Sequence, residues 1–189
     1  MWADQALERV LARYKPPRHV LDIGYGDGEH LRCFRAAGYQ VTGVDWKDGA
    51  DYNKTPMPHK YDVIWCSHVL EHQLNVNHFL EKCYEDLVDG GVLAITVPPL
   101  KHEIVGGHLT LWNQGLLLYN LILAGFDCRK ARVSPVYDYN ISVIVEQSPI
   151  SEDVLAQLHY DAGDIEALAE YFPFPVHQGF DGSRVSWGW

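Results

Sequence analysis

The sequence is short of cysteine, methionine and basic residues. Its 189 residues include 4 cysteines and 2 methionines, and the cysteines show neither CxxC spacing nor the density of a disulfide framework. We therefore expect reduced, mostly buried thiols. The 15 Lys and Arg residues stand against 25 Asp and Glu residues, which gives a net charge of -10. That sign is wrong for neutralising a phosphate backbone, so we expect no nucleic-acid partner.

Long apolar runs are also missing. The longest, residues 92–99 and 116–124, are far below the ~20 residues that a membrane span needs. The N-terminal residues lack the basic region and apolar stretch of a secretory signal. We therefore expect no membrane partner and a cytoplasmic location. With 47% hydrophobic and 21% charged residues, the chain has the composition of an ordinary globular domain.

The apolar spacing predicts an α/β domain over residues 1–150. Helical spacing covers residues 3–14, 29–37, 75–88 and 113–124, and strand-like runs cover 19–23, 41–44, 61–66 and 92–97. Strands this apolar that alternate with helices indicate a parallel sheet covered on both faces. The runs 126–133 and 139–147 are joined by a short turn, so we expect them to form an antiparallel pair.

Two segments depart from this regular alternation. Residues 46–60 contain Pro56 and Pro58, which exclude a long helix and leave room only for a brief strand near residues 50–52. Residues 151–189 form a C-terminal appendage, with one helix expected over 152–171 and an aromatic tail after it. We expect this appendage to be a lid or an interface.

The motif VLDIGYGDG, residues 20–28, carries the most chemical information. A buried strand runs through three glycines directly into a helix, and such glycines let the backbone approach a ligand and aim the helix N-terminus at it. Asp45 ends the next strand, where a carboxylate can accept both hydroxyls of a ribose. Glu29 stands where the dinucleotide fingerprint has its third glycine, so this loop suits a cationic ligand better than a pyrophosphate. The pattern indicates an adenosine site.

This segment resembles the class I S-adenosylmethionine-dependent methyltransferases, in particular the small-molecule type 11 and type 23-like group, whose first strand ends in a motif similar to LDIGCGDG. Further matches follow in the family's order: VTGVD (41–45), YDVIWCSHVLEH (61–72) and LVDGGVLAITVPP (87–99). The resemblance covers roughly residues 18–147. It implies a Rossmann-like fold with helices on both faces of a seven-stranded, mostly parallel sheet, in the order 3-2-1-4-5-7-6 with one antiparallel strand.

The resemblance also implies a cofactor, S-adenosylmethionine, with S-adenosylhomocysteine as its product. It places Asp22 near the methionine amino group, Asp45 at the ribose hydroxyls and Trp46 against the adenine. The full set of expected cofactor-binding residues is Asp22, Gly24, Tyr25, Gly26, Gly28, Asp45, Trp46, Asp51, Cys66 and Ser67.

On the acceptor side, the resemblance places the transferred methyl group beside His68. We expect His68 to act as a general base in an in-line displacement; the alternatives are that it only contacts substrate or caps the following helix. His102 and His108 do not align with a third ligand such as Glu103, so no metal is expected. The expected substrate-binding residues are His72, His102, His108, Trp112 and Tyr139.

The expected function is methyl transfer from S-adenosylmethionine to an oxygen or nitrogen of a small-molecule or saccharide acceptor, by a monomer or homodimer. A rival hypothesis is a non-catalytic partner or regulatory subunit with the same fold, motivated by the short 46–60 segment and the aromatic tail. A second rival is a nicotinamide-dependent oxidoreductase, against which Glu29 and the segment SHVLEH argue.

Overall fold

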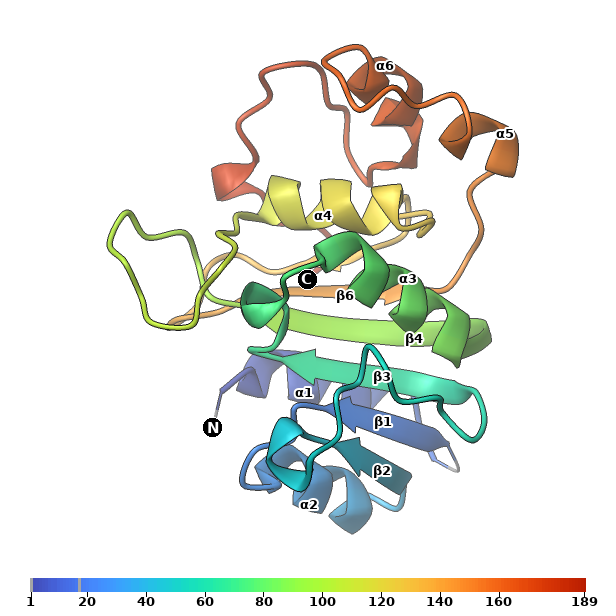
Figure 1. Cartoon of the computed structure of the whole chain (residues 1–189), viewed down its shortest axis with the longest axis vertical. Helices are drawn as coiled ribbons and strands as arrows, with labels where there is room; N and C mark the ends of the chain where they lie inside the picture. The colour runs from blue at the N-terminus through green and yellow to red at the C-terminus, as the bar shows by residue number, and fades with distance from the viewer. Residues whose placement is uncertain (1, 17) are drawn as a thin grey trace.

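The computed structural model describes residues 2–16 and 18–189, and Figure 1 shows a central sheet with helices packed around it. Within these residues the sheet has six strands in the order β2-β1-β3-β4-β6-β5. Strands β1 to β4 are parallel, and β6 is antiparallel to both β4 and β5. The strands are β1 (His19–Ile23), β2 (Gln40–Val44), β3 (Tyr61–Ser67), β4 (Leu87–Val97), β5 (Arg132–Val133) and β6 (Ile141–Glu146).

Helices cover both faces of the sheet, which confirms the expected α/β class. The α-helices are α1 (Asp4–Arg13), α2 (Glu29–Ala36), α3 (Val76–Asp86), α4 (Gln114–Leu123), α5 (Glu152–Leu155) and α6 (Asp164–Leu168). Short 3-10 helices are η1 (Trp46–Asp48), η2 (Leu70–His72), η3 (Ala169–Tyr171) and η4 (Gly182–Arg184). Asn75 and Asn113 begin α3 and α4 by accepting the backbone N–H three residues on, from His78 and Leu116.

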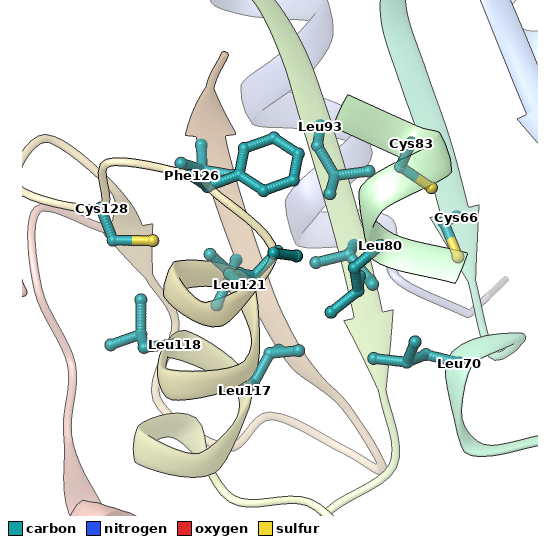
Figure 2. Close-up of a cluster of buried hydrophobic side chains, with 14 of the residues drawn as sticks. Cys66, Leu70, Leu80, Cys83, Leu93, Leu117, Leu118, Leu121, Phe126 and Cys128 are labelled. Atoms are coloured by element: carbon teal, nitrogen blue, oxygen red, sulfur yellow. The ribbon is translucent and has the colours of Figure 1, made fainter. Parts of the chain in front are cut away.

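Alternation along the strands divides the core into two clusters. Val63 and Trp65 of β3 point to the face covered by α1 and α2, while Ile64 and Cys66 point to the face covered by α3 and α4. Figure 2 shows the second cluster, in which leucines of α4 meet those of α3 and β4, with three cysteine side chains among them. Both faces of the sheet are thus buried, which explains why the strand sequences are continuous apolar runs.

The sheet has one strand fewer than the seven expected. The brief strand expected near residues 50–52 is instead a turn, in which the carbonyl of Asp51 accepts hydrogen bonds from the backbone N–H of Lys54 and Thr55 at 3.0 and 2.9 Å. Tyr52 is buried and anchors the turn, because its hydroxyl donates to Asp86 Oδ2 at 2.8 Å. The segment is too short and too rich in proline to add a full strand, so β2 forms the edge of the sheet.

The C-terminal region also differs from the sequence-based expectation. Only Arg132–Val133 of the run 126–133 pairs as a strand, and the helix expected over 152–171 is broken into α5, α6 and η3. Asp164 causes this break, since its carboxylate accepts the backbone N–H of His159, Tyr160 and Asp161 at 3.1, 2.6 and 3.3 Å. A side chain that binds backbone N–H groups in this way replaces helical hydrogen bonds with a turn.

The appendage packs on the domain. Leu168, Tyr171 and Phe172 belong to the α3/α4 core cluster, and Trp187 forms a β-bridge with Val133 of β5. Among the described residues, no helix has both the length and the apolarity that crossing a bilayer requires.

Candidate functional site

The carboxyl ends of the parallel strands meet at one edge of the sheet. The arrowheads of β1, β2 and β3 point to the same side of Figure 1, where the loop that follows β4 also lies. The register pairs Ile23 with Val44 and with Cys66, and it pairs Ser67 with Thr96. Residues that immediately follow these strands are therefore neighbours. In open parallel sheets this edge is where ligands bind.

The glycine loop after β1 is built for close backbone approach. Gly24 has a φ of 69°, and a Cβ there would lie 2.3 Å from Cγ2 of Val69, so only glycine fits against the segment after β3. Gly26 also has a positive φ, of 50°, yet a Cβ there would meet no atom within 4 Å. The space above Gly26 is thus open, as a ligand cradle requires.

Asp45 is held directly against this loop. Its Oδ2 accepts the backbone N–H of Gly26 at 2.7 Å, and its Oδ1 accepts that of Lys47 at 2.9 Å. The carboxylate is therefore fixed in orientation, and each oxygen keeps a lone pair for a ligand hydroxyl. Trp46 follows immediately with 84% of its surface exposed, so its ring is available for stacking.

A small polar cluster borders the loop on the β2 side. The ring of Tyr25 lies over Gly43, its hydroxyl bonds to Asp48, and Lys47 Nζ is 4.2 Å from the ring centroid. Lys47 also donates to the carbonyl of Gly26. Three side chains therefore hold the glycine loop and the η1 turn together.

Asp22, in β1 beneath the loop, is a buried acid with an orphaned oxygen. It is 1% exposed, and its Oδ2 has no hydrogen-bond partner among the described residues. Burial, and then the nearby charge of Asp45, raise the pKa of Asp22 to about 8. An ionised carboxylate here needs a cation beside it, so the site favours a positively charged ligand.

His68 follows β3 in a left-handed conformation, with a φ of 56°. Its ring is fixed at both nitrogens: Nε2 lies 2.9 Å from Oδ1 of Asn140, and Nδ1 lies 3.2 Å from Oε1 of Glu71. Burial by itself lowers the pKa of His68, but the contacts with Glu71 and Asn140 outweigh it, so the pKa is raised. A strained backbone and two fixed nitrogens are typical of a functional side chain.

Aromatic rings surround His68. Tyr139 is stacked on its ring at 6.3 Å, and the ring of Trp2 lies 5.1 Å away. The carbonyl of Trp2 is 2.9 Å from Nε2 of His30, which fixes the N-terminal segment over the edge of the sheet. The sequence-based prediction included Tyr139 but missed Trp2, His30 and Asn140, because no motif connects residues so far apart in the chain.

The other predicted residues lie in different surroundings, some in the core and some at or near the site. Cys66 and Trp112 are buried in the core, and Asp51 is paired with Lys54 at 2.9 Å. Ser67 ends β3 beside the site, and Gly28 is the residue before α2. His72 and His108 have ring centroids 5.2 Å apart, while His102 is exposed. The structure thus brings together the glycine loop with Asp45, His68 with Tyr139, and His72 with His108.

The arrangement combines two chemical functions at one edge. The glycine loop, Asp45 and Asp22 form a cradle with hydroxyl acceptors and a carboxylate that lacks a partner, which suits a cationic nucleoside. His68, with Asn140 and Tyr139, lies after the neighbouring strand and can contact a second molecule. Such a site can hold two reactants in line.

Comparisons with known proteins identify a family and a fold. Residues 2–123 match the family described as a methyltransferase domain. No curated protein matches the sequence. A solved S-adenosylmethionine-dependent methyltransferase from Archaeoglobus fulgidus superposes with a TM-score of 0.63 and 19% identity, covering 75% of this chain and 91% of the other.

Two further solved structures have the same fold. The 1,6-didemethyltoxoflavin-N1-methyltransferase of Burkholderia thailandensis, with bound 1,6-didemethyltoxoflavin and S-adenosylhomocysteine, gives a TM-score of 0.62 at 16% identity and covers 77% of each chain. The [4+2]-cyclase SpnF gives a TM-score of 0.56 at 21% identity, covering 69% of this chain and 60% of the other. At such identities the likeness concerns the fold.

Proposed function

The chain belongs to the methyltransferase-domain family, and we propose that it transfers a methyl group from S-adenosylmethionine to an oxygen or nitrogen of a small-molecule or saccharide acceptor. The observation that carries the proposal is the hydrogen bond from the Gly26 N–H to Asp45, which fixes an acidic strand end against an open glycine loop. The family match and this geometry both support the proposal.

The residues present fit S-adenosylmethionine. Asp22 supplies a buried, unpartnered carboxylate oxygen for a cationic group, and Gly26 leaves open space beside Asp45. Asp45 would hold the ribose hydroxyls, and the exposed ring of Trp46 would cover the adenine. When bound, the cofactor supplies an electrophilic methyl group on a sulfonium.

The acceptor would lie on the His68 side of the site. In-line displacement needs the nucleophile about 3 Å from the methyl carbon in a pocket without water, so positioning supplies most of the catalysis. Tyr139 and Trp2, whose rings lie next to His68, would exclude water and contact the acceptor. His68 would accept a proton from the acceptor when the acceptor must lose one. Because Nε2 faces Asn140 and Nδ1 faces Glu71, one ring nitrogen would first have to leave its partner.

A small acceptor is supported by charge and by one structural neighbour. The net charge of -10 disfavours a nucleic-acid substrate. The Burkholderia thailandensis neighbour is an N1-methyltransferase crystallised with its small-molecule acceptor. We also propose residues 151–189 as a lid or interface, because this appendage packs directly on α4.

A second candidate function is a non-catalytic partner or regulatory subunit. The observation that favours it is the short segment after β2, which makes turns where a further strand was expected and leaves Trp46 exposed. This candidate predicts cofactor binding without turnover, or no cofactor binding.

Isothermal titration with S-adenosylhomocysteine tests the proposal. We expect the wild type to bind and Asp45→Ala to lose at least ~1 kcal/mol of binding free energy, the scale of one charge-assisted hydrogen bond. Asp89→Ala, which removes an exposed carboxylate near the start of β4 and away from the site, is the matched control and should bind like the wild type. Failure of the folded wild type to bind would favour the non-catalytic candidate. Binding would justify a screen of hydroxyl and amine acceptors for methyl transfer.

A further inference from the structure

Glu71 is a buried carboxylate that the proposed methyl transfer does not use. It is 0% exposed, Oε2 has no hydrogen-bond partner among the described residues, and Oε1 has contacts at ion-pair distance with His68 and His72. The nearest nitrogen that can carry charge is Nδ1 of His68, at 3.2 Å. Burying a carboxylate without partners is expensive unless a cation compensates it.

His72 directs a second potential ligand atom at the same point. Its Nδ1 lies 2.6 Å from the carbonyl oxygen of Gly107, and a carbonyl can only accept, so Nδ1 carries the proton. In the neutral ring, Nε2 therefore holds the lone pair, and it lies 3.8 Å from Oε1 of Glu71. Metal-binding histidines commonly have this arrangement, with the distal N–H donated to a backbone carbonyl.

His108 is the third member, and the fold brings it here from a distant part of the chain. The carbonyl oxygen of Glu71 accepts the backbone N–H of Leu109 at 2.7 Å and of Thr110 at 3.2 Å, which docks the loop after β4 against η2. The rings of His72 and His108 are then 5.2 Å apart at 82°. The histidine ring beside His108 is therefore that of His72, a pairing that the sequence analysis did not predict.

We propose that Glu71, His72 and His108 form a binding site for a divalent transition-metal ion. Their ligand atoms all lie within 4.8 Å of one another. Ligands bound to one zinc ion at about 2.0–2.2 Å are themselves about 3–4 Å apart, so small side-chain movements complete the site. The ion would neutralise the buried carboxylate of Glu71, whose Oε2 lacks a hydrogen-bond partner among the described residues.

The donor set selects the kind of ion. Two imidazoles with one carboxylate suit Zn²⁺ and the neighbouring first-row ions, whereas Mg²⁺ and Ca²⁺ prefer oxygen ligands throughout. Three protein ligands leave at least one position for water or a small molecule. Because Glu71 contacts His68, that position lies beside the proposed acceptor side of the site.

Zinc binding by the untagged full chain tests the site. The protein is freed of metal with a chelator and titrated with Zn²⁺ against a chromophoric competitor. We expect one tightly bound equivalent, with affinity reduced at least tenfold in Glu71→Gln, His72→Ala and His108→Ala. His102→Ala, in the same loop, is the matched control and should retain the affinity of the wild type. Co²⁺ bound in place of Zn²⁺ should give a visible spectrum that Glu71→Gln alters.

Equal zinc affinity in the wild type and in either His72→Ala or His108→Ala would overturn the proposal, as would the absence of a tight equivalent. These histidines are not fully buried, so their variants remain informative even if Glu71→Gln fails to fold. S-adenosylhomocysteine binding is measured in parallel. If the wild-type protein binds S-adenosylhomocysteine but not zinc, only the metal site is refuted. If it binds zinc but not S-adenosylhomocysteine, only the proposed function is refuted.

Discussion

The backbone N–H of Gly26 donates a 2.7 Å hydrogen bond to Oδ2 of Asp45, which joins the loop after β1 to the end of β2. Two motifs that are separate in the sequence therefore form one rigid unit. The bond orients a carboxylate before any ligand arrives, so less ordering is left for the binding step.

Gly26→Ala should block the cradle. The new methyl group would project into the open space above the loop, and we expect affinity for S-adenosylhomocysteine to fall at least tenfold in calorimetry. Gly90→Ala is the matched control, because Gly90 also has a positive φ and open space around it, but lies in the strand β4 away from the site. Both variants should lose a similar ~1–2 kcal/mol of stability from left-handed alanine. Equal nucleoside affinity in both would contradict a ligand at Gly26.

Asp22 should make the stability of the ligand-free protein depend on pH. Its folded pKa, about 8, lies above the unfolded value near 3.8, so the folded state binds the extra proton between these values. The contribution of the protonated Asp22 carboxyl to the free energy of unfolding is complete below pH 4. It falls as pH rises toward 8, by at most ~1.4 kcal/mol per pH unit.

Asp22→Asn removes this dependence. The free energy of unfolding of both proteins is measured in urea at pH 5, 6, 7 and 8. The difference, variant minus wild type, should increase by ~1 kcal/mol or more from pH 5 to pH 8. If the free energies of unfolding of the two proteins changed equally with pH, Asp22 would be ionised in the folded protein. The same variant should bind S-adenosylhomocysteine more weakly, because the ammonium group loses its carboxylate.

Asn140 should act as a positioning residue through His68. Asn140→Ala removes the acceptor that lies 2.9 Å from Nε2 of His68, so we expect kcat to fall about tenfold while the Kd for S-adenosylhomocysteine is unchanged. Asn140→Asp keeps an oxygen acceptor and should restore most of the turnover. The measurement uses an acceptor found by the screen described above. A parallel loss of nucleoside affinity in Asn140→Ala would instead indicate a purely structural role.

Asp164→Ala should loosen the appendage. It removes one carboxylate that accepts three backbone N–H groups, which we expect to cost ~1–3 kcal/mol in local stability. Hydrogen exchange of residues 159–164 should accelerate, with exchange in β3 unaffected. Asp161→Ala is the control, since the exposed carboxylate of Asp161 accepts the nearby N–H of Gly163 and not the N–H groups that Asp164 binds.

The regular part of the fold could be predicted because periodicity and glycines report on local geometry. The glycine loop and Asp45 follow from strands that run parallel to one edge, and the structure places them in contact. The turn at Asp51 and the break at Asp164 could not be predicted, because each involves an aspartate carboxylate that accepts backbone N–H groups: that of Asn53 at Asp51, and those of residues 159–161 at Asp164.

The acceptor side was predicted only in part, since it depends on segments that meet in space. His68 could be found from its position after β3, whereas its partner Asn140 immediately precedes β6, far away in the sequence. His108 lies beside His72 because the backbone carbonyl of Glu71 accepts hydrogen bonds from the loop that follows β4. No residue spacing in the sequence predicts a backbone contact of that kind.

The reactivity of the buried thiols can be used to measure local opening of the protein core. Cys66, Cys83 and Cys128 are fully buried, and burial raises the pKa of each thiol, so a thiol reagent reaches them as thiolates only when the core is breached. Cys66 lies in β3, and Cys128 lies beyond α4 (Figure 2). Their separate labelling rates in native buffer would therefore distinguish opening of the central sheet from detachment of the region that follows α4.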